Sequence, residues 1–198
     1  RLLKGTERKE ALEKAASLPP FILAPENVSD VDMIAVGAMS PLTGFMSQAD
    51  YEGVVETMRL SSGVVWSIPI TLAVSQEVAA SIADGAEVAL YQATDEGPHL
   101  LAIMQVESKY TYDKEREASQ VYRTTEEAHP GVARIYAQGD VLLGGPIWVI
   151  NRPAGLDFTE YRFDPIDTRR AFAERGWRRI VGFQTRNPIH RAHEFIQK

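Results

Sequence analysis

The sequence predicts an α+β fold in two parts: a body of helices around a small, mostly antiparallel sheet or barrel over residues 1–150, then the opening of a doubly wound α/β domain. Two observations favour this fold. Residues 64–110 are rich in Val, Ile, Leu and Tyr in short runs separated by turn residues, as in the strands of a small sheet. After Pro165 the predicted order is helix, strand, turn and helix. Because a doubly wound domain needs more strands than follow, we expect the chain to be a fragment that stops inside its second domain.

Serine and aspartate caps, apolar residues at helical spacing, and proline or glycine stops predict the helices of the first part. These helices cover residues 6–17, ended by Pro19 and Pro20; 29–36, capped by Ser29 or Asp30 and ended by Gly37; 47–59, capped by Ser47 with Asp50; and the shorter segments 112–122 and 130–137.

Short runs rich in β-branched and aromatic residues predict strands over residues 66–74, 86–93, 99–108 and 141–150. The tetrapeptide Asp95-Glu96-Gly97-Pro98 is a hairpin signal between the second and the third of these. The tripeptide Gly144-Gly145-Pro146 is expected to interrupt or bulge the last strand. Hairpins of this kind favour antiparallel pairing.

Proline and glycine mark the passage to the second part. We expect residues 1–153 to form the first domain, residues 154–165 a linker, and residues 166–198 the start of the second domain. The elements predicted there are a helix over 169–175, capped by Asp167 or Thr168 and ended by Gly176; a strand over 178–183; and a helix that Asn187 caps with Pro188 at its first position.

Composition limits the function classes. The chain has 198 residues, 44% hydrophobic and 24% charged, as in ordinary globular proteins. It contains no cysteine, which excludes a disulfide framework, a cysteine nucleophile and Cys-ligated metal sites and is compatible with a cytoplasmic location. No apolar run approaches the ~18 residues of a membrane span, and no leader opens the chain. Because the chain starts with Arg1 and not Met, we expect the native N-terminus to be missing.

The charge is unevenly distributed. The net charge is −6, from 21 Lys and Arg against 27 Asp and Glu, so we expect no nucleic-acid partner. Residues 165–198 carry eight basic against three acidic residues, whereas residues 1–164 carry 13 against 24. A small basic segment on an acidic body predicts a local anion site. The competing interpretation is a solvated helix face for five of its arginines: Arg169, Arg170, Arg175, Arg178 and Arg179.

The chemistry is expected in one turn, which reads Gln184-Thr185-Arg186-Asn187-Pro188-Ile189-His190-Arg191-Ala192-His193. It lies where a predicted strand feeds a helix, the usual ligand position in open α/β sheets. His190 and His193 share one face of the first helical turn and, with the helix N-terminus, can donate to phosphate oxygens. Arg186 adds a planar fork suited to phosphate or sulfate. With donors for oxyanions and no evident nucleophile, the turn favours phosphoryl or nucleotidyl transfer.

Simpler interpretations of the same residues remain open at this point. Asn187 and Pro188 by themselves form an ordinary helix cap, and Arg186 by itself is an ordinary surface residue. His190 and His193 could be metal ligands, but zinc needs further ligands and the chain has four histidines and no cysteine. We therefore expect no metal site.

The ten residues of this turn resemble the signature of the ATP sulfurylase (sulfate adenylyltransferase) family. A second segment, Met39-Ser40-Pro41-Leu42-Thr43-Gly44-Phe45-Met46, resembles a loop of that family's N-terminal domain. Asn151-Arg152-Pro153 and Phe163-Asp164-Pro165 fall where the family leaves that domain and enters the catalytic one. The resemblance therefore spans essentially the whole chain.

The resemblance implies a PUA-like β-barrel with helical additions, followed by the start of a Rossmann-like nucleotidyltransferase domain. The implied reaction converts ATP and sulfate reversibly to adenylyl sulfate and pyrophosphate by direct in-line attack. Mg²⁺ would accompany ATP as substrate, no tightly bound cofactor is implied, and the parent protein would be a homo-oligomer. The family's later Gly-Arg-Asp-His-type nucleotide loop does not occur in these residues, so activity of this chain by itself is not implied.

The resemblance also implies roles for individual residues. Gln184 and Arg186 would bind sulfate, and Thr185, Arg186 and Asn187 would be catalytic. His190, His193 and Asn187 would hold the phosphates of ATP.

Two other functions remain in competition. A different nucleotidyltransferase with a His-x-x-His helix would share the second half of the turn, but it does not require Gln-Thr-Arg before it. A non-catalytic module built on the PUA-like barrel would bind RNA or act as a scaffold. The acidic balance of residues 1–164 disfavours RNA.

Overall fold

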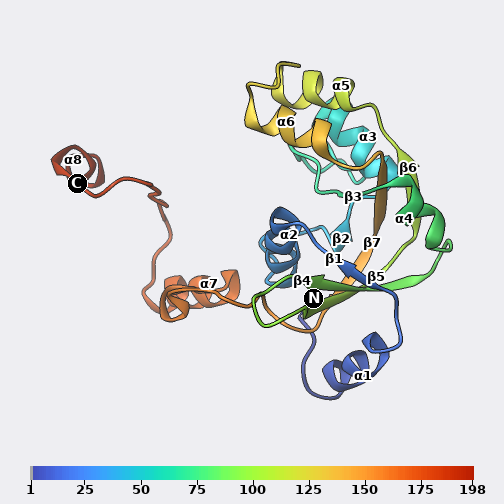
Figure 1. Cartoon of the computed structure of the whole chain (residues 1–198). Coiled ribbons are helices and arrows are strands. Elements are labelled where there is room, and N and C mark those ends of the chain that lie inside the picture. The colour runs from blue at the N-terminus through green and yellow to red at the C-terminus, as the bar shows by residue number, and fades with distance from the viewer. Residues whose placement is uncertain (1) are drawn as a thin grey trace. The chain divides into compact units, whose positions relative to one another are not determined.

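A computed structural model describes residues 2–198 of the chain (Figure 1). The chain divides into two compact units, the first ending at Arg162 and the second comprising Phe163–Lys198. Helices and strands alternate irregularly in the first unit, whereas the second contains two helices, α7 and α8, and no strand among its described residues.

The first unit is an α+β unit in which, among the described residues 2–162, six short α-helices, one π-helical turn and one 3-10 turn accompany the sheet. The α-helices are α1 (Gly5–Ala15), α2 (Pro25–Ala35), α3 (Gln48–Thr57), α4 (Gln76–Ser81), α5 (Lys114–Glu117) and α6 (Pro130–Ala137). A π-helical turn, Ala118–Tyr122, continues α5, and a 3-10 turn covers Thr159–Tyr161. The strands are β1 (Pro20–Ile22), β2 (Gly44–Phe45), β3 (Leu72–Val74), β4 (Glu87–Gln92), β5 (His99–Gln105), β6 (Ser108–Thr111) and β7 (Val141–Val149).

Strand β7 organises a curled, half-barrel sheet whose main path runs β1-β4-β5-β7-β2. Its first residues pair with β3 and β6, with Leu143 opposite both Leu72 and Lys109. Its later residues pair with β2 and β5, with Met104 opposite Ile147. All these pairs are antiparallel, and only β1 runs parallel to its neighbour β4. The prediction of a small, mostly antiparallel sheet is therefore confirmed.

Glycines let the backbones approach where β7 changes partners. Gly145 has φ +152°, and a Cβ there would lie 2.0 Å from the carbonyl oxygen of Gln105. A Cβ on Gly44 would lie 2.0 Å from the carbonyl oxygen of Gly145. The predicted strand over residues 141–150 is confirmed, but the expected interruption is not: β7 continues through Gly144-Gly145-Pro146, where it exchanges one pair of neighbours for another.

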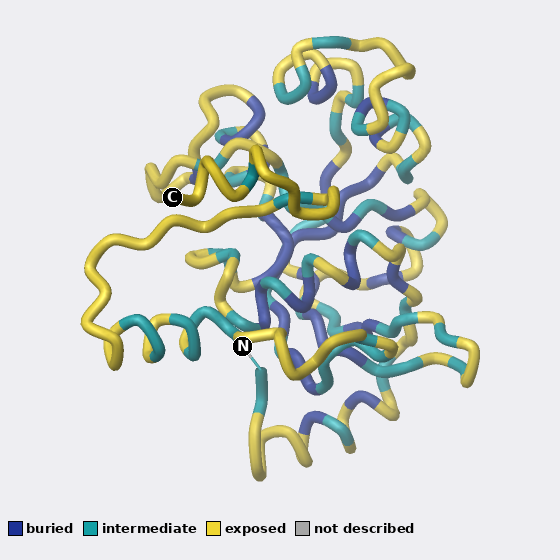
Figure 2. The backbone as a smooth tube through the Cα atoms, turned by 90° about the vertical axis from the view of Figure 1, so that its left-hand side faces the viewer, coloured by how far each residue is buried: buried dark blue, intermediate teal, exposed yellow. Residues whose placement is uncertain are grey.

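The apolar core follows the strands. Figure 2 shows the buried positions gathered along them. One cluster packs α2 against the sheet and includes Ile34, Leu90, Met104 and Ile147. A smaller cluster seats α1 on the sheet through Ala11, Ala15 and Ile103, and a third lies under α3 around Val54, Tyr110 and Leu142. Helices thus cover the sheet through separate apolar contacts.

Several predicted elements of the first unit are confirmed. Helices occur at α1, α3 and α6, and the helix predicted over 112–122 is present from Lys114 to Tyr122. The Ser47 hydroxyl accepts the Asp50 N–H at 3.3 Å, as expected of the α3 cap. Strands β4 and β5 form the predicted hairpin, in which Gly97 has φ +113°. Gly37, at φ +80°, follows the end of α2 as predicted.

Other boundaries in the first unit were wrong. The helix expected over 29–36 begins at Pro25, because proline at the first helical position starts it a turn earlier than Ser29 or Asp30. The strand expected over 66–74 is only β3, since β7 offers partners to three of its residues. The strand expected over 99–108 is two strands, β5 and β6. Strand β1 and helix α4 were not predicted.

The second unit consists of α7 (Pro165–Glu174), α8 (Arg191–Gln197) and the segment between them. Helix α7 starts at Pro165 rather than near Thr168, again with proline at its first position, and Gly176, at φ +66°, follows its end as predicted. The predicted strand over 178–183 is absent: these residues form no regular secondary structure, because the described residues 163–198 contain no other strand that could accept their hydrogen bonds. No helix within residues 2–198 is long and apolar enough to cross a membrane.

Candidate functional site

The predicted site turn, residues 184–193, joins the extended segment of the second unit to α8. Its first half is closed by Thr185. The Thr185 hydroxyl oxygen accepts the backbone N–H of Asn187 at 3.1 Å and donates to the Asn187 carbonyl oxygen at 3.3 Å. A threonine that hydrogen-bonds two residues ahead fixes a tight polar turn. Thr185 is half-buried, and its neighbours Gln184 and Arg186 are exposed.

The second half of the turn corrects the predicted helix start. Helix α8 begins at Arg191 with His190 as its N-cap, and not at Pro188 with Asn187 as the cap. The Asn187 N–H is engaged by Thr185, and His190 supplies the capping acceptor instead: its Nδ1 accepts the N–H of Ala192 at 3.2 Å. The chain therefore enters the helix three residues later than the Asn-Pro pair indicates.

His190 and His193 lie together at the start of α8. His193 Nδ1 accepts the backbone N–H of His190 at 3.3 Å, so the two histidines complete a capping box. Their ring centroids are 3.9 Å apart, and the ring of Phe183 meets that of His193 in a T-shaped contact at 5.7 Å. The predicted sharing of one face by these two imidazoles is confirmed, although His190 caps the helix and does not lie inside it.

The structure brings the site residues together only in part. Thr185 contacts Asn187, and His190 contacts His193. Within residues 2–198, no hydrogen bond or ion pair joins Arg186 or Gln184 to the other members of the set. The guanidinium of Arg186 is exposed, with its donors available to a planar oxyanion. The turn can therefore offer one guanidinium, amide and hydroxyl groups, and two imidazoles to an anionic ligand.

The perturbed titratable groups lie elsewhere, in the first unit. Glu117 of α5 is buried and accepts the Tyr51 hydroxyl at 2.8 Å. Burial raises the pKa of Glu117, while the Tyr51 hydrogen bond and the charge of Arg134 oppose that rise. Burial and the Glu117 charge raise the pKa of Tyr51, whose ring contacts those of Tyr110 and Tyr112. This cluster sits in the packing between α3, α5 and β6, so it supports the fold and adds nothing to the turn.

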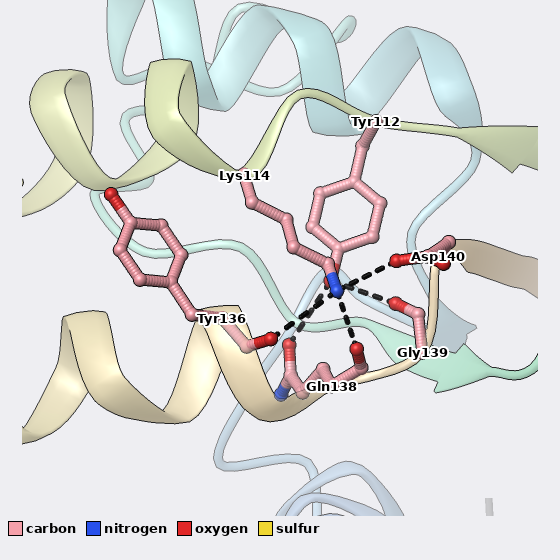
Figure 3. A network of polar contacts seen from close by, with 6 residues as sticks. All are labelled: Tyr112, Lys114, Tyr136, Gln138, Gly139 and Asp140. Atoms are coloured by element: carbon pink, nitrogen blue, oxygen red, sulfur yellow. Dashed lines mark hydrogen bonds and ion pairs between the residues drawn. The ribbon is translucent and has the colours of Figure 1, made fainter. Parts of the chain in front are cut away.

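Lys114 of α5 forms a second polar network of the first unit (Figure 3). Its Nζ donates to the carbonyl oxygens of Gln138 at 2.5 Å and Tyr136 at 3.5 Å and pairs with Asp140 at 2.7 Å. It also lies 5.9 Å from the ring centroid of Tyr112. A cation on the last carbonyls of α6 is the arrangement that the helix dipole favours. Sequence reasoning missed this lysine, because the contact depends on where α6 ends in space.

Side chains from distant parts of the sequence bind residues 151–154, near the C-terminal end of the first unit. Arg152 forms a two-point ion pair with the buried Asp32 of α2, with N···O distances of 2.6 and 3.2 Å. His99 Nε2 lies 3.0 Å from the Arg152 carbonyl oxygen, and the Gln92 amide makes two hydrogen bonds with the backbone of Ala154. The tripeptide Asn151-Arg152-Pro153, singled out from the sequence, is thus the segment that the fold fastens.

One cavity of the first unit lies close to the end of that unit. A cavity of about 440 Å³ lies beside the Asp32–Arg152 pair, and its lining is mostly apolar. Among residues 2–198, no group of three or more His, Cys, Asp or Glu side chains could hold a metal ion. The turn at 184–193 remains the candidate site.

Comparison with known proteins assigns both parts of the chain. Residues 1–152 match a family described as PUA-like domain, and residues 159–198 match one described as ATP-sulfurylase. The chain is 54% identical over 198 residues to a sulfate adenylyltransferase from Symbiobacterium thermophilum, covering 100% of this chain and 49% of that protein. It is 52% identical to one from Nostoc punctiforme, covering 100% of this chain and 50% of that protein. The chain thus spans about half the length of the curated relatives it matches.

A solved structure is also similar. The hexameric APS kinase from Thiobacillus denitrificans matches with a TM-score of 0.74 and 29% identity, covering 100% of this chain and 35% of that one. The expected resemblance to ATP sulfurylases is therefore confirmed, and so is the PUA-like first part.

Proposed function

We propose that the chain is part of an enzyme that transfers the adenylyl group from ATP to sulfate. The premise is that the chain belongs to the PUA-like domain family over residues 1–152 and enters an ATP-sulfurylase domain at residue 159. One observation carries the proposal. The turn at 184–193, with its exposed guanidinium and paired imidazoles, falls inside the ATP-sulfurylase match. The relatives that match the whole chain are named sulfate adenylyltransferases.

The proposed reaction is a direct displacement. A sulfate oxygen attacks the α-phosphorus of ATP, the bond from that phosphorus to the oxygen bridging to the β-phosphate breaks, and pyrophosphate leaves with the electron pair. Sulfate need not lose a proton before it attacks, so the reaction requires no general base. The main difficulty of the reaction is electrostatic, because the sulfate and ATP anions must approach each other. Hydrogen-bond donors that neutralise both anions therefore lower the barrier.

Six residues of the turn take a part in this proposal. Arg186 binds sulfate with Gln184, because a guanidinium fork matches a tetrahedral oxyanion. Thr185 and Asn187 form the catalytic turn with Arg186, and their mutual hydrogen bonds support its shape. His190 and His193, with Asn187, hold the ATP phosphates. No carboxylate lies among residues 184–193, so the turn offers Mg²⁺ no charged ligand, and the phosphates of ATP would be the main ligands of the ion.

We divide the protein accordingly. Residues 1–153 form the PUA-like domain, residues 154–165 the linker, and residues 166–198 the start of a Rossmann-like catalytic domain. The fastening of residues 151–154 by Asp32, His99 and Gln92 supports an end of the first domain there. A cytoplasmic location, where ATP is available, and assembly as a homo-oligomer belong to the same proposal. The solved relative is described as hexameric.

The test measures pyrophosphate release from ATP with sulfate or molybdate as acceptor, on the full-length protein and on this chain side by side. Arg186→Ala is expected to lower acceptor-dependent release about 10²- to 10³-fold, the usual effect of removing one charge-stabilising donor. Arg186→Lys should rescue poorly, because an ammonium cannot replace the fork. Arg170→Ala, in an exposed arginine of α7 whose ion pair with Asp167 is 3.6 Å long, is the matched control and should retain activity.

Two outcomes would contradict the proposal. Full activity of Arg186→Ala would remove the sulfate assignment. Failure of the folded full-length protein to release pyrophosphate with sulfate or molybdate would favour another His-x-x-His nucleotidyltransferase, and a screen of other adenylyl acceptors would follow.

A further inference from the structure

A small cavity of the first unit lies between α2, α6 and the segment that leads into β3. Its volume is about 210 Å³, whereas pockets for drug-sized ligands measure about 300–1,000 Å³, so this cavity suits a small molecule. Helix α2 lines it with Glu26, Asn27 and Asp30, and α6 lines it with Arg134 and, at its end, Gln138. The cavity therefore brings carboxylates, a guanidinium and two amides together.

Charges of opposite sign line this cavity from two different helices. Glu26 and Asp30 are four residues apart on α2 and so share one face of that helix. Among the described residues 2–198, no ion pair joins Arg134 of α6 to either carboxylate. Burial raises the pKa of Asp30, while the hydrogen bond from Asn27 and the charge of Arg134 oppose that rise. The opposite charges are thus near enough to interact but stay apart, which leaves room for a ligand that carries both charges.

A buried side chain orients the acidic wall of the cavity. Asn27 is 8% exposed, and its amide nitrogen donates to the Asp30 carboxylate at 3.2 Å and to the Thr71 carbonyl oxygen at 2.9 Å. Because both partners can only accept, they fix which end of the amide faces them. Within residues 2–198 the Asn27 amide oxygen has no hydrogen-bond partner. An ammonium group in the cavity can supply that missing donor as well as meet the carboxylates.

The other walls supply hydrogen-bond donors and an apolar contact. The guanidinium of Arg134 makes one long hydrogen bond among the described residues, at 3.4 Å to the Tyr122 hydroxyl. Most of its five N–H donors therefore remain for a ligand carboxylate, which a guanidinium binds at two points. Ile68 and Pro69 line the cavity beside these charges, and Ile68 is 46% exposed. An aliphatic group of a ligand would shield this apolar wall from water.

We propose that this cavity binds a small α-amino acid with a short aliphatic side chain. Arg134 takes the α-carboxylate, Glu26 and Asp30 take the α-ammonium group, and Ile68 contacts the side chain. Asn27 is a positioning residue, because it holds the Asp30 carboxylate in place. All of these residues belong to the first unit, so the site shares none with the turn of the proposed function.

Three probes of similar shape test whether both charges of the ligand are required. L-valine carries an ammonium and a carboxylate, isobutylamine carries only the ammonium, and isovalerate carries only the carboxylate. Isothermal titration calorimetry on the full-length protein should show L-valine binding at least about tenfold more tightly than either other probe, the usual effect of losing a charged hydrogen-bonding group. Isobutylamine binding as tightly as L-valine would show that acidic residues alone attract the ligand and would overturn the inference. Absence of L-valine binding would overturn it too.

Substitutions then locate the binding site. Arg134→Gln should weaken L-valine binding at least about tenfold and leave isobutylamine binding unchanged, because it removes only the group that faces the carboxylate. Asp30→Asn and Glu26→Gln should each weaken the binding of both ligands. Arg170→Gln, in the exposed arginine of α7, is the matched control and should bind L-valine like the wild type.

The exposed position of Arg134 makes its substitution compatible with the fold, and circular dichroism of each variant checks this. Wild-type affinity for L-valine in folded Arg134→Gln would overturn the inference. A loss of affinity in Arg170→Gln equal to that in Arg134→Gln would do the same, because it would show a response to overall charge and not to this cavity.

Discussion

The two units of the chain differ in what holds them in shape. In the first unit, apolar side chains such as Leu90, Met104 and Ile147 are fully buried along the sheet. In the second, neither α7 nor α8 buries a residue, and Val181 and Phe195 are 92% and 83% exposed. The candidate site therefore lies on the part of the described chain that has no apolar core of its own.

The polar contacts of the two units also differ, in the sequence separation that they bridge. Arg152 pairs with Asp32, 120 residues away, and so joins the end of the first unit to one of its early helices. In the second unit, the described contacts Thr185–Asn187, His190–His193 and Glu194–Lys198 join residues two to four positions apart. Tertiary packing therefore determines the structure of the first unit, whereas local capping and turn hydrogen bonds determine that of the second.

The largest expected change in stability comes from a matched pair of isoleucine substitutions, one in a helix of each unit. Ile34 of α2 is 1% exposed, and Ile196 of α8 is 71% exposed. Ile34→Ala should lower the free energy of unfolding of the chain by about 2–5 kcal/mol, because it leaves a cavity in the core. Ile196→Ala should change it by less than about 0.5 kcal/mol. Urea unfolding of the two variants measures both values, and equal effects would break the comparison.

A smaller loss in the free energy of unfolding is expected from substitutions at two lysines, one in each unit. Lys114 is mostly buried among the last carbonyls of α6 and Asp140, whereas Lys198 pairs with Glu194 on the surface at 2.6 Å. Lys114→Met keeps the alkyl stem and removes the charged hydrogen bonds, so we expect a loss of about 1–2 kcal/mol. Lys198→Met should cost at most about 0.5 kcal/mol.

Thermal unfolding at low and high salt checks this second prediction. The Lys198 effect should vanish at high salt. Most of the Lys114 effect should persist, because Lys114 also donates to the backbone carbonyl oxygens of Tyr136 and Gln138, and salt screens these hydrogen bonds less than the ion pair with the exposed Asp140. Salt sensitivity of the Lys114 effect would show that its contacts are solvated.

The smallest expected effect is a pH dependence at Glu117. Because burial raises the folded-state pKa of this carboxyl, the proton it binds stabilises the folded state below the ordinary glutamate pKa, and that stability is lost as pH rises through the raised value. Glu117→Gln keeps an acceptor for Tyr51 and does not titrate. The Tm of the variant minus that of the wild type should therefore grow as pH rises from about 4 toward neutrality.

Glu77→Gln provides the control of opposite sign. The Ser75 hydrogen bond lowers the pKa of the exposed Glu77, so its stabilising effect is lost as pH falls. A Glu117 difference that is flat with pH, or that shrinks as pH rises, would contradict the third prediction.

Local signals in the sequence predicted much of this molecule. The Ser47 cap, the hairpin signal at Gly97 and the glycine stops at Gly37 and Gly176 correspond to features of the structure. Proline was the least reliable signal. Pro25 and Pro165 start helices that were expected to begin later, whereas Pro188 precedes its helix because His190 supplies the cap. A proline tolerates the first helical position without fixing it: α2 and α7 begin at a proline without a side-chain cap, whereas α8 begins after Pro188, at the His190 cap.

The sequence alone determined the family of the chain and predicted the turn that would carry its chemistry, because donor types, their spacing and the identity of a motif are properties of the chain. Tertiary structure decided the rest of the first unit. Strand β3 stops where β7 stops offering partners, and Lys114 meets the end of α6. Arg152 finds Asp32 across 120 residues. Such contacts depend on where distant segments meet, and a strand exists only where a neighbour completes its hydrogen bonds.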